Sequence, residues 1–238
     1  MRDDDAASPA VLPVLLVGAG ALAATVAAAS RAPSNAPSNA PSNAPPNATA
    51  EDDGETWVWP LPSWSGYPPT ISDGFGSWRT DAAGKRIQHM GVDVMYARRG
   101  ARDQVAAFPP RTPHGSAGSF MPDAVPVLAV RDASVWSAAR TSRGYAVVLD
   151  HGPPWATFYQ HMSEMFVEAT QRARSGQRVR AGDVLGYVGA DPLDGEGLMH
   201  LHFEVWYRGG PSAAIDPAPL MTSWLVLPVE RGRPTRVA

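Results

Sequence analysis

The sequence lacks cysteine entirely and carries no excess of basic residues, with a formal net charge of −3 over 238 residues. Without cysteine there can be no disulfide bond and no thiolate metal site, so any metal ion must be held by histidine, aspartate or glutamate. Proteins that bind nucleic acid usually present a basic patch, and this composition gives no case for a nucleic-acid partner. Hydrophobic residues make up 44% of the chain, which is enough to bury the core of one ordinary domain.

Charge is also missing from Ala10–Ala29, where the chain consists mostly of Ala, Val and Leu. About 20 such residues in a helix would span a hydrocarbon core of ~30 Å. We therefore interpret residues 1–30 as a single membrane anchor or as a secretory signal, cut after the small residues near Ala29. The acidic residues Asp3–Asp5 are unusual in a signal and favour the anchor. Either interpretation predicts an exported protein of the cell envelope, membrane-anchored, periplasmic or extracellular.

A four-residue repeat follows this segment. Ala32-Pro33-Ser34-Asn35 occurs twice more with the same residues and then once as Ala44-Pro45-Pro46-Asn47. Regularly spaced proline forbids a helix, and the repeat has no apolar face to bury. Residues 31–54 are therefore predicted to be a disordered linker that holds a folded domain away from a membrane.

The folded domain is predicted to span residues 55–222 and to be mainly β, with an unexplained tail at 223–238. Short apolar or alternating runs, separated by turn residues, are typical of an antiparallel sheet. These runs are Pro126–Val130, Ser134–Ala138, Tyr145–Asp150 and Trp155–His161. A short helix is expected over Glu164–Arg174, and a long surface loop over Ala97–Pro122.

The start of the domain is rich in tryptophan, proline and glycine. Trp57, Trp59 and Trp64 lie among prolines that prevent long helices, so we expect irregular chain whose aromatic residues pack on the core. Ligand binding by the same cluster is the alternative. Gly74 and Gly76 flank a phenylalanine, which suggests a turn with close approach of another backbone.

The chemically richest stretch runs from His200 to Tyr207. Its alternation predicts a half-buried strand, with His200, His202 and Glu204 on the face opposite the apolar residues. Two histidines two apart on a strand would lie roughly 6–7 Å apart, from ~3.3 Å per residue. This spacing suits one metal ligand beside a histidine with a second role. The alternative is a polar strand with two idle imidazoles.

A second pair of possible ligands is His89 and Asp93. In a straight strand these residues would lie ~13 Å apart, too far to share one ion, so the pair requires a bend at Gly91. His161 ends the run Trp155–His161 and is a further candidate. The remaining histidines, at positions 114 and 151, are expected to be ordinary loop and turn residues.

Taken in order, these fragments resemble the lysostaphin/LytM-type zinc endopeptidases of bacterial cell walls. That family shows Trp-Pro, Ser-x-Gly-Phe-Gly, His-x-Gly-x-Asp, Tyr-x-His-x-Ser, a Gly-Gln-x-Val run and His-Leu-His-Phe-Glu. The matching segments here are Trp59-Pro60, Ser72 to Gly76, His89 to Asp93, Tyr159 to Ser163, Gly176 to Gly186 and His200 to Glu204. The loop at 97–122 is longer than is usual in the family, and the residues just before His200 differ from its pattern.

The resemblance implies that His89, Asp93 and His202 bind one zinc ion. It also implies that His161 and His200 line the site as catalytic residues. The implied activity is hydrolysis of peptidoglycan stem or crossbridge peptides by a zinc-activated water. Some members of this family have lost the site, so the alternatives are a non-enzymatic regulator of the cell envelope or a peptidoglycan-binding domain.

Overall fold

The computed structural model describes residues 56–80, 84–98, 118–167, 177–193 and 198–229. The predicted anchor, the predicted linker, His114 and most of the expected 97–122 loop lie outside these ranges. None of the helices found within them is long and apolar enough to cross a bilayer.

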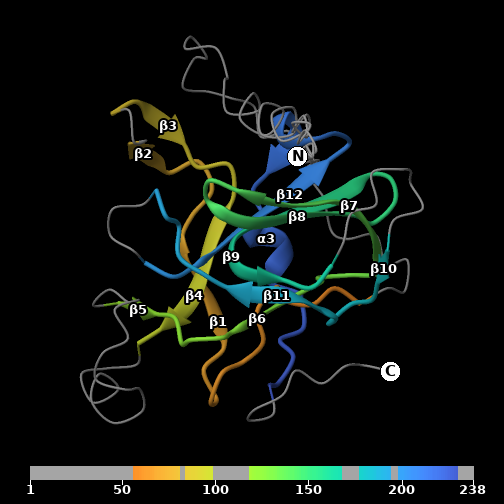
Figure 1. The fold of residues 1–238 in the computed structure, drawn as a ribbon, viewed down its shortest axis with the longest axis horizontal. Coiled ribbons are helices and arrows are strands. Elements are labelled where there is room, and N and C mark those ends of the chain that lie inside the picture. The colour runs from red at the N-terminus through yellow and green to blue at the C-terminus, as the bar shows by residue number, and fades with distance from the viewer. Residues whose placement is uncertain (1–55, 81–83, 99–117, 168–176, 194–197, 230–238) are drawn as a thin grey trace, which may run out of the picture. The chain divides into compact units, whose positions relative to one another are not determined.

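One large sheet dominates the described residues (Figure 1). Its main path runs β1-β4-β12-β9-β8-β7-β10, and every pair along it is antiparallel. In that order the strands are Pro69–Asp73, Val92–Ala97, Leu201–Tyr207, Trp155–Met165, Gly144–Asp150, Ala133–Thr141 and Arg178–Val179. The predicted mainly β, antiparallel architecture is therefore confirmed.

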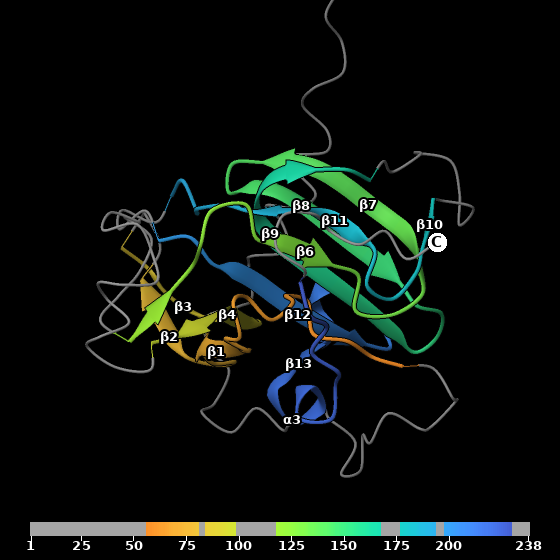
Figure 2. The ribbon, with the colours of Figure 1, turned by 90° about the horizontal axis from the view of Figure 1, so that it is seen from below.

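Shorter elements complete the domain. β11 (Val184–Val188) pairs with both β6 (Pro126–Leu128) and β9, while β5 (Ser119–Phe120) pairs with β4. A separate hairpin is formed by β2 (Trp78–Thr80) and β3 (Arg86–Gln88). The chain then passes through η1 (Pro211–Ala213), β13 (Ala214–Ile215) and α3 (Ala218–Met221), and Figure 2 shows α3 on one side of the sheet next to β13.

The four predicted runs all contain strands, and two other expectations are wrong at the residues that the structure describes. β9 continues to Met165, so Glu164 is in a strand and the expected helix does not begin there. Its residues from 168 onward lie outside the described ranges. Within the expected 97–122 loop, Ser119–Phe120 form a strand and Phe120 is buried.

The opening tryptophans pack on the core, as expected. The ring of Trp57 stacks on Trp224, with centroids 5.0 Å apart, and Val58 forms a parallel bridge with Leu225. Trp59 and Trp64 are partly buried against the same core. Because Trp224 belongs to this packing, the folded region extends beyond the expected boundary at residue 222.

β12 lies between β4 and β9 and is buried on both faces, which corrects the prediction of a half-buried strand. Leu201, Phe203 and Val205 point into the apolar core and are fully buried. On the opposite face His202 is 8% exposed and Glu204 is 7% exposed. Buried polar groups require partners, so this polar face must be built into an interacting site.

Candidate metal centre

A bend at Gly91 brings the two ends of the His89–Asp93 segment to the same place. A Cβ atom built at Gly91 would lie only 2.4 Å from the carbonyl oxygen of Phe203 and 2.8 Å from Cγ of Glu204. Only glycine allows β4 to begin this close to β12. The predicted bend is thus confirmed, and its cause is the close approach of the two strands.

Three side chains meet where β4 pairs with β12. Nε2 of His89 lies 2.8 Å from Nδ1 of His202 and 3.2 Å from Oδ1 of Asp93. The third side of this triangle, from Nδ1 of His202 to Oδ1 of Asp93, measures 3.4 Å. In the described part of the chain these three buried residues are the group that could hold a metal ion. We call this group the ligand triangle.

Hydrogen bonds fix which nitrogen of each imidazole faces the ligand triangle. Nδ1 of His89 lies 3.0 Å from the carbonyl oxygen of Gly74, and Nε2 of His202 lies 2.8 Å from Oε1 of Glu204. These oxygens can only accept, which favours an N–H on each of the two nitrogens, and the shorter contact of His89 Nδ1 is to Gly74, since Nη2 of Arg79 lies 3.2 Å away. The other nitrogens, Nε2 of His89 and Nδ1 of His202, are then free to bind a metal. Trp206 donates from Nε1 to the second oxygen of Glu204 at 2.6 Å and holds that carboxylate in place.

The two oxygens of the Asp93 carboxylate have different surroundings. Oδ2 accepts a hydrogen bond from Nη2 of Arg79, which also donates to Asp73. Oδ1 is buried and makes no hydrogen bond within the described residues, although it faces both imidazoles of the ligand triangle. Burial opposes ionisation, but contacts with His202 and His89 hold the pKa of Asp93 well below its usual value. The site therefore presents an anionic oxygen that lacks a partner, as a metal ligand would.

His161 reaches the site through a β-bulge. Two residues of β9, Gln160 and His161, lie opposite the single residue Ala146 of β8, and His161 has a positive φ of 67°. Simple alternation would place His161 on the core face with Tyr159. Bulges re-aim side chains in this way beside active sites. A Cβ at Gly144 would lie 2.9 Å from the carbonyl oxygen of Met162, so glycine is needed where β8 meets the bulge.

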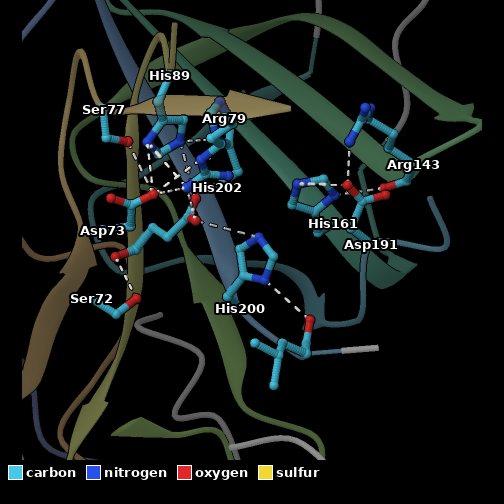
Figure 3. A network of polar contacts seen from close by, with 12 residues as sticks. Ser72, Asp73, Ser77, Arg79, His89, Arg143, His161, Asp191, His200 and His202 are labelled. Carbon is cyan, nitrogen blue, oxygen red and sulfur yellow. Dashed lines mark hydrogen bonds and ion pairs between the residues drawn. The ribbon is translucent and has the colours of Figure 1, made fainter. Parts of the chain in front are cut away.

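His161 and His200 form a second pair beside the ligand triangle (Figure 3). Their ring centroids are 4.7 Å apart, and the His161 ring is 5.9 Å from that of His202. Each ring has Nδ1 against a carbonyl oxygen, Arg143 at 3.0 Å for His161 and Leu198 at 3.1 Å for His200. Each Nε2 is thus left without a proton and able to accept one.

The electrostatics around His161 favour a neutral ring. Burial lowers the pKa of His161 well below its usual value, and the nearby His200 and His202 lower it further. Nε2 of His200 is buried without a hydrogen bond in the described residues and lies 3.7 Å from Oδ2 of Asp93. The arrangement therefore offers two proton acceptors next to the ligand triangle.

Four charged residues of the site had not been predicted: Asp73, Arg79, Arg143 and Asp191. Arg79 follows the glycine turn closely in sequence, so the turn was a signal for it. Asp191 is 4% exposed and forms an ion pair with Arg143, which lies 48 positions earlier. No pattern in the sequence connects that pair.

The glycine turn is present, and the backbone of His89 lies against it, as expected. A Cβ at either Gly74 or Gly76 would meet no atom within 4 Å, so this approach does not itself require glycine. Gly76 has a positive φ of 76°, a conformation that glycine adopts readily. The turn holds His89 from both sides, because Gly76 donates to the His89 carbonyl at 2.8 Å and the His89 amide donates to Ser77 at 2.9 Å.

His151 lies in the turn between β8 and β9, as expected for an ordinary turn residue. Its Nε2 is 2.8 Å from the hydroxyl oxygen of Thr157, and its ring packs 5.3 Å from that of Trp57. His151 is therefore not part of the ligand triangle.

Part of the chain is similar to known peptidases. Residues 112–217 match the model of peptidase family M23, a range that includes His161, His200 and His202 but begins after Asp93. The peptidoglycan DD-endopeptidase ShyA of Vibrio cholerae is 31% identical over 104 residues, which cover 43% of this chain and 22% of ShyA. The aligned part of the chain thus spans about a fifth of that relative's length.

The fold also occurs in a solved complex, and a lower similarity is found to a peptidase domain. The SpoIIQ–SpoIIIAH pore-forming complex contains a chain that superposes with a TM-score of 0.50 at 19% identity, covering 70% of this chain and 91% of that one. The catalytic domain of the antimicrobial peptidase lysostaphin from Staphylococcus simulans superposes with a TM-score of 0.43 at 22% identity, covering 66% of this chain and 93% of that one. The match of residues 112–217 to peptidase family M23 agrees with the predicted resemblance to the LytM-type peptidases.

Proposed function

We propose that this chain is an exported zinc-dependent endopeptidase that hydrolyses the peptide crosslinks of bacterial peptidoglycan. The observation that carries the proposal is the ligand triangle of His89, Asp93 and His202, with ligand atoms 2.8, 3.2 and 3.4 Å apart. Ligands at ~2.0–2.2 Å from a tetrahedral zinc are separated by about 3.4 Å. Two imidazoles and one carboxylate also leave a fourth position open, which distinguishes catalytic zinc sites from structural ones.

The unsatisfied oxygen of Asp93 supports the same assignment. A buried carboxylate oxygen without a hydrogen bond is costly, and a cation bound in the triangle would remove that cost. Zinc in such a site acts as a Lewis acid toward the scissile carbonyl and lowers the pKa of a bound water to around 7.

The protein's own part in the reaction falls to His161 and His200. Both present an unprotonated Nε2 toward the site, because the Nδ1 proton of each is donated to a backbone carbonyl. Between them they can take the proton of the attacking water and deliver one to the leaving amine. The neutral state of His161 at ordinary pH suits the accepting role.

The substrate class rests on the relatives. ShyA is described as a peptidoglycan DD-endopeptidase, and this chain shares with it 31% identity over 104 residues. We extend that substrate class to this chain, together with a place in the cell envelope. In the same proposal residues 10–29 anchor the protein or direct its export, and residues 31–54 separate the catalytic domain from the membrane.

The test is to purify the full chain, measure its metal content and digest crosslinked muropeptides, with mass spectrometry of the products. We expect about one zinc per chain and cleavage of a peptide bond that a chelator abolishes and added zinc restores. His202→Ala should lose both zinc and activity. His151→Gln, a histidine variant outside the ligand triangle, should retain both. Binding of muropeptides without any cleavage by the zinc-loaded protein would instead support the non-enzymatic regulator or binding domain.

A further inference from the structure

Arg143 lies beside the catalytic pair, in the tight turn between β7 and β8. The turn is fixed by its own hydrogen bonds, since the Arg143 amide donates to Oγ1 of Thr141 at 3.0 Å and that hydroxyl donates to the Gly144 carbonyl at 2.8 Å. The carbonyl oxygen of Arg143 accepts the Nδ1 proton of His161. The backbone of Arg143 is therefore held in place relative to the site.

The side chain of Arg143 is oriented by Asp191. Oδ2 of Asp191 accepts from Nη1 of Arg143, while Oδ1 accepts from the amide of Leu193 at 2.9 Å. Figure 3 shows Arg143, Asp191 and His161 close together, on the opposite side of His202 from Asp73. Asp191 thus fixes one edge of the guanidinium next to the proposed proton acceptor.

The two members of this ion pair differ in what they offer to a substrate. The Asp191 side chain is 5% exposed, whereas that of Arg143 is 35% exposed. Nε and Nη2 of Arg143 make no hydrogen bond to any residue in the described ranges, so donors of its planar fork remain available. A group bound at the site would therefore meet a guanidinium and not a carboxylate.

We propose that Arg143 is a specificity-determining residue that binds a carboxylate of the substrate near the scissile bond. This inference rests on the proposed peptidase function and adds the class of substrate, a peptide with a free carboxylate close to its crosslink. Arginine is the side chain best suited to such a role, because its rigid fork matches the two oxygens of a carboxylate.

The position of Arg143 limits where that carboxylate lies. Asp191 Oδ2 is 3.9 Å from Nε2 of His161, and the His161 ring is 5.9 Å from that of His202. An extended peptide advances ~3.3 Å per residue, so the bound carboxylate lies within about three residues of the scissile bond.

The experiment compares two forms of one substrate on the full, zinc-loaded chain. One crosslinked muropeptide carries its free carboxylate, and the other has the same group converted to a carboxamide. The wild type should cleave the carboxylate form with a kcat/KM about tenfold higher, as expected for a hydrogen bond to a charged group in a partly exposed site. Arg143→Gln should remove the preference, so that the ratio of kcat/KM for the carboxylate form to that for the carboxamide form falls from about ten to about one.

Two further variants separate recognition from structure. Arg143→Lys keeps the charge but loses the fork, and should retain only part of the preference. Arg140→Gln is the matched control: Arg140 lies on β7, and its guanidinium packs over the ring of Tyr145 at 5.8 Å, so its loss should not affect the preference. Zinc content and melting temperature are measured for each variant.

Equal cleavage of both substrates by the wild type would overturn the role of Arg143 and leave the peptidase function standing. An equal loss on both substrates in Arg143→Gln, with zinc retained, would also overturn it, because that result indicates a structural role. No cleavage of either substrate by the zinc-loaded wild type would overturn both the specificity and the proposed function.

Discussion

Arg79 donates a hydrogen bond to Oδ2 of Asp93, so that only Oδ1 of this carboxylate faces the imidazoles of His89 and His202. The same guanidinium bonds Asp73 through Nε at 3.0 Å, which anchors it to β1. Arg79 therefore determines which oxygen of the proposed ligand is presented to a metal. Residues that hydrogen-bond to a metal ligand orient it, and their loss commonly weakens metal affinity by about 10–100-fold.

Arg79→Gln is accordingly expected to weaken zinc binding by about tenfold or more, with a smaller effect on folding. A competition titration with a chromophoric chelator measures the affinity. Arg86→Gln is the control, because Arg86 lies on the neighbouring strand of the same hairpin and packs over Trp78 at 4.6 Å. Equal zinc affinity in the wild type and Arg79→Gln would show that Arg79 does not orient Asp93.

Gly91→Ala should destabilise the protein and disturb the metal centre together. The new methyl group would lie 2.4 Å from the backbone carbonyl of Phe203, which cannot move without displacing β12. Overpacking of this kind costs ~1–3 kcal/mol, equivalent to a fall in melting temperature of roughly 2–12 °C for a domain of this size. Calorimetry of the variant measures the change.

Gly210→Ala provides the comparison for that variant. A Cβ at Gly210 would meet nothing within 4 Å, and its φ of −91° is open to other residues. This substitution should leave the melting temperature within about 1 °C of the wild type. If Gly91→Ala changed the melting temperature as little as Gly210→Ala, that result would contradict the close approach of β4 to β12.

The order of motifs along the chain made much of the site predictable. The turn residues between the four predicted runs defined β6 to β9, and the His89–Asp93 spacing required the bend that Gly91 makes. Both inferences used residues near one another in sequence, where local geometry limits the outcome.

Features that depend on contacts between distant segments could not be predicted in this way. His161 follows Tyr159 by two positions, so alternation alone assigns both to the core face, and only the register of β8 against β9 reveals the bulge. Asp191 and Arg143 meet across 48 positions of sequence. The burial of the polar face of β12 likewise results from neighbouring segments and not from its own pattern.

Glu204 and Trp206 are expected to control how firmly His202 is held. Trp206→Phe keeps an aromatic ring but removes the N–H that donates to Oε2 of Glu204 at 2.6 Å. The freed carboxylate should orient His202 less well, with faster dissociation of zinc and an affinity lowered by about tenfold. Stopped-flow chelation measures the dissociation rate.

Trp136→Phe serves as the control for this prediction. Trp136 is 58% exposed and contacts Trp206 edge-on, with centroids 6.4 Å apart, whereas the side-chain hydrogen bonds of Glu204 among the described residues are to His202 and Trp206. Its zinc dissociation rate should match that of the wild type. A dissociation rate unchanged in Trp206→Phe would remove this residue from the set that supports the metal.

The metal-free protein should lose stability as the pH rises through the folded-state pKa of His202. Burial disfavours the charged imidazolium, but contacts with Asp93 and Glu204 outweigh it and raise the pKa of His202 from 6.5 to about 9. A raised folded-state pKa contributes stability that is fully present below the unfolded value of 6.5 and disappears above the folded one. The melting temperature of the chelator-treated protein should therefore fall between pH 7 and pH 10, and that of His202→Gln should fall less.

The zinc-loaded protein provides a control. Zinc replaces the proton on Nδ1 of His202, so the melting temperature of the zinc-loaded wild type should also decline less over this range. Parallel pH profiles for the metal-free wild type and His202→Gln would contradict the raised pKa.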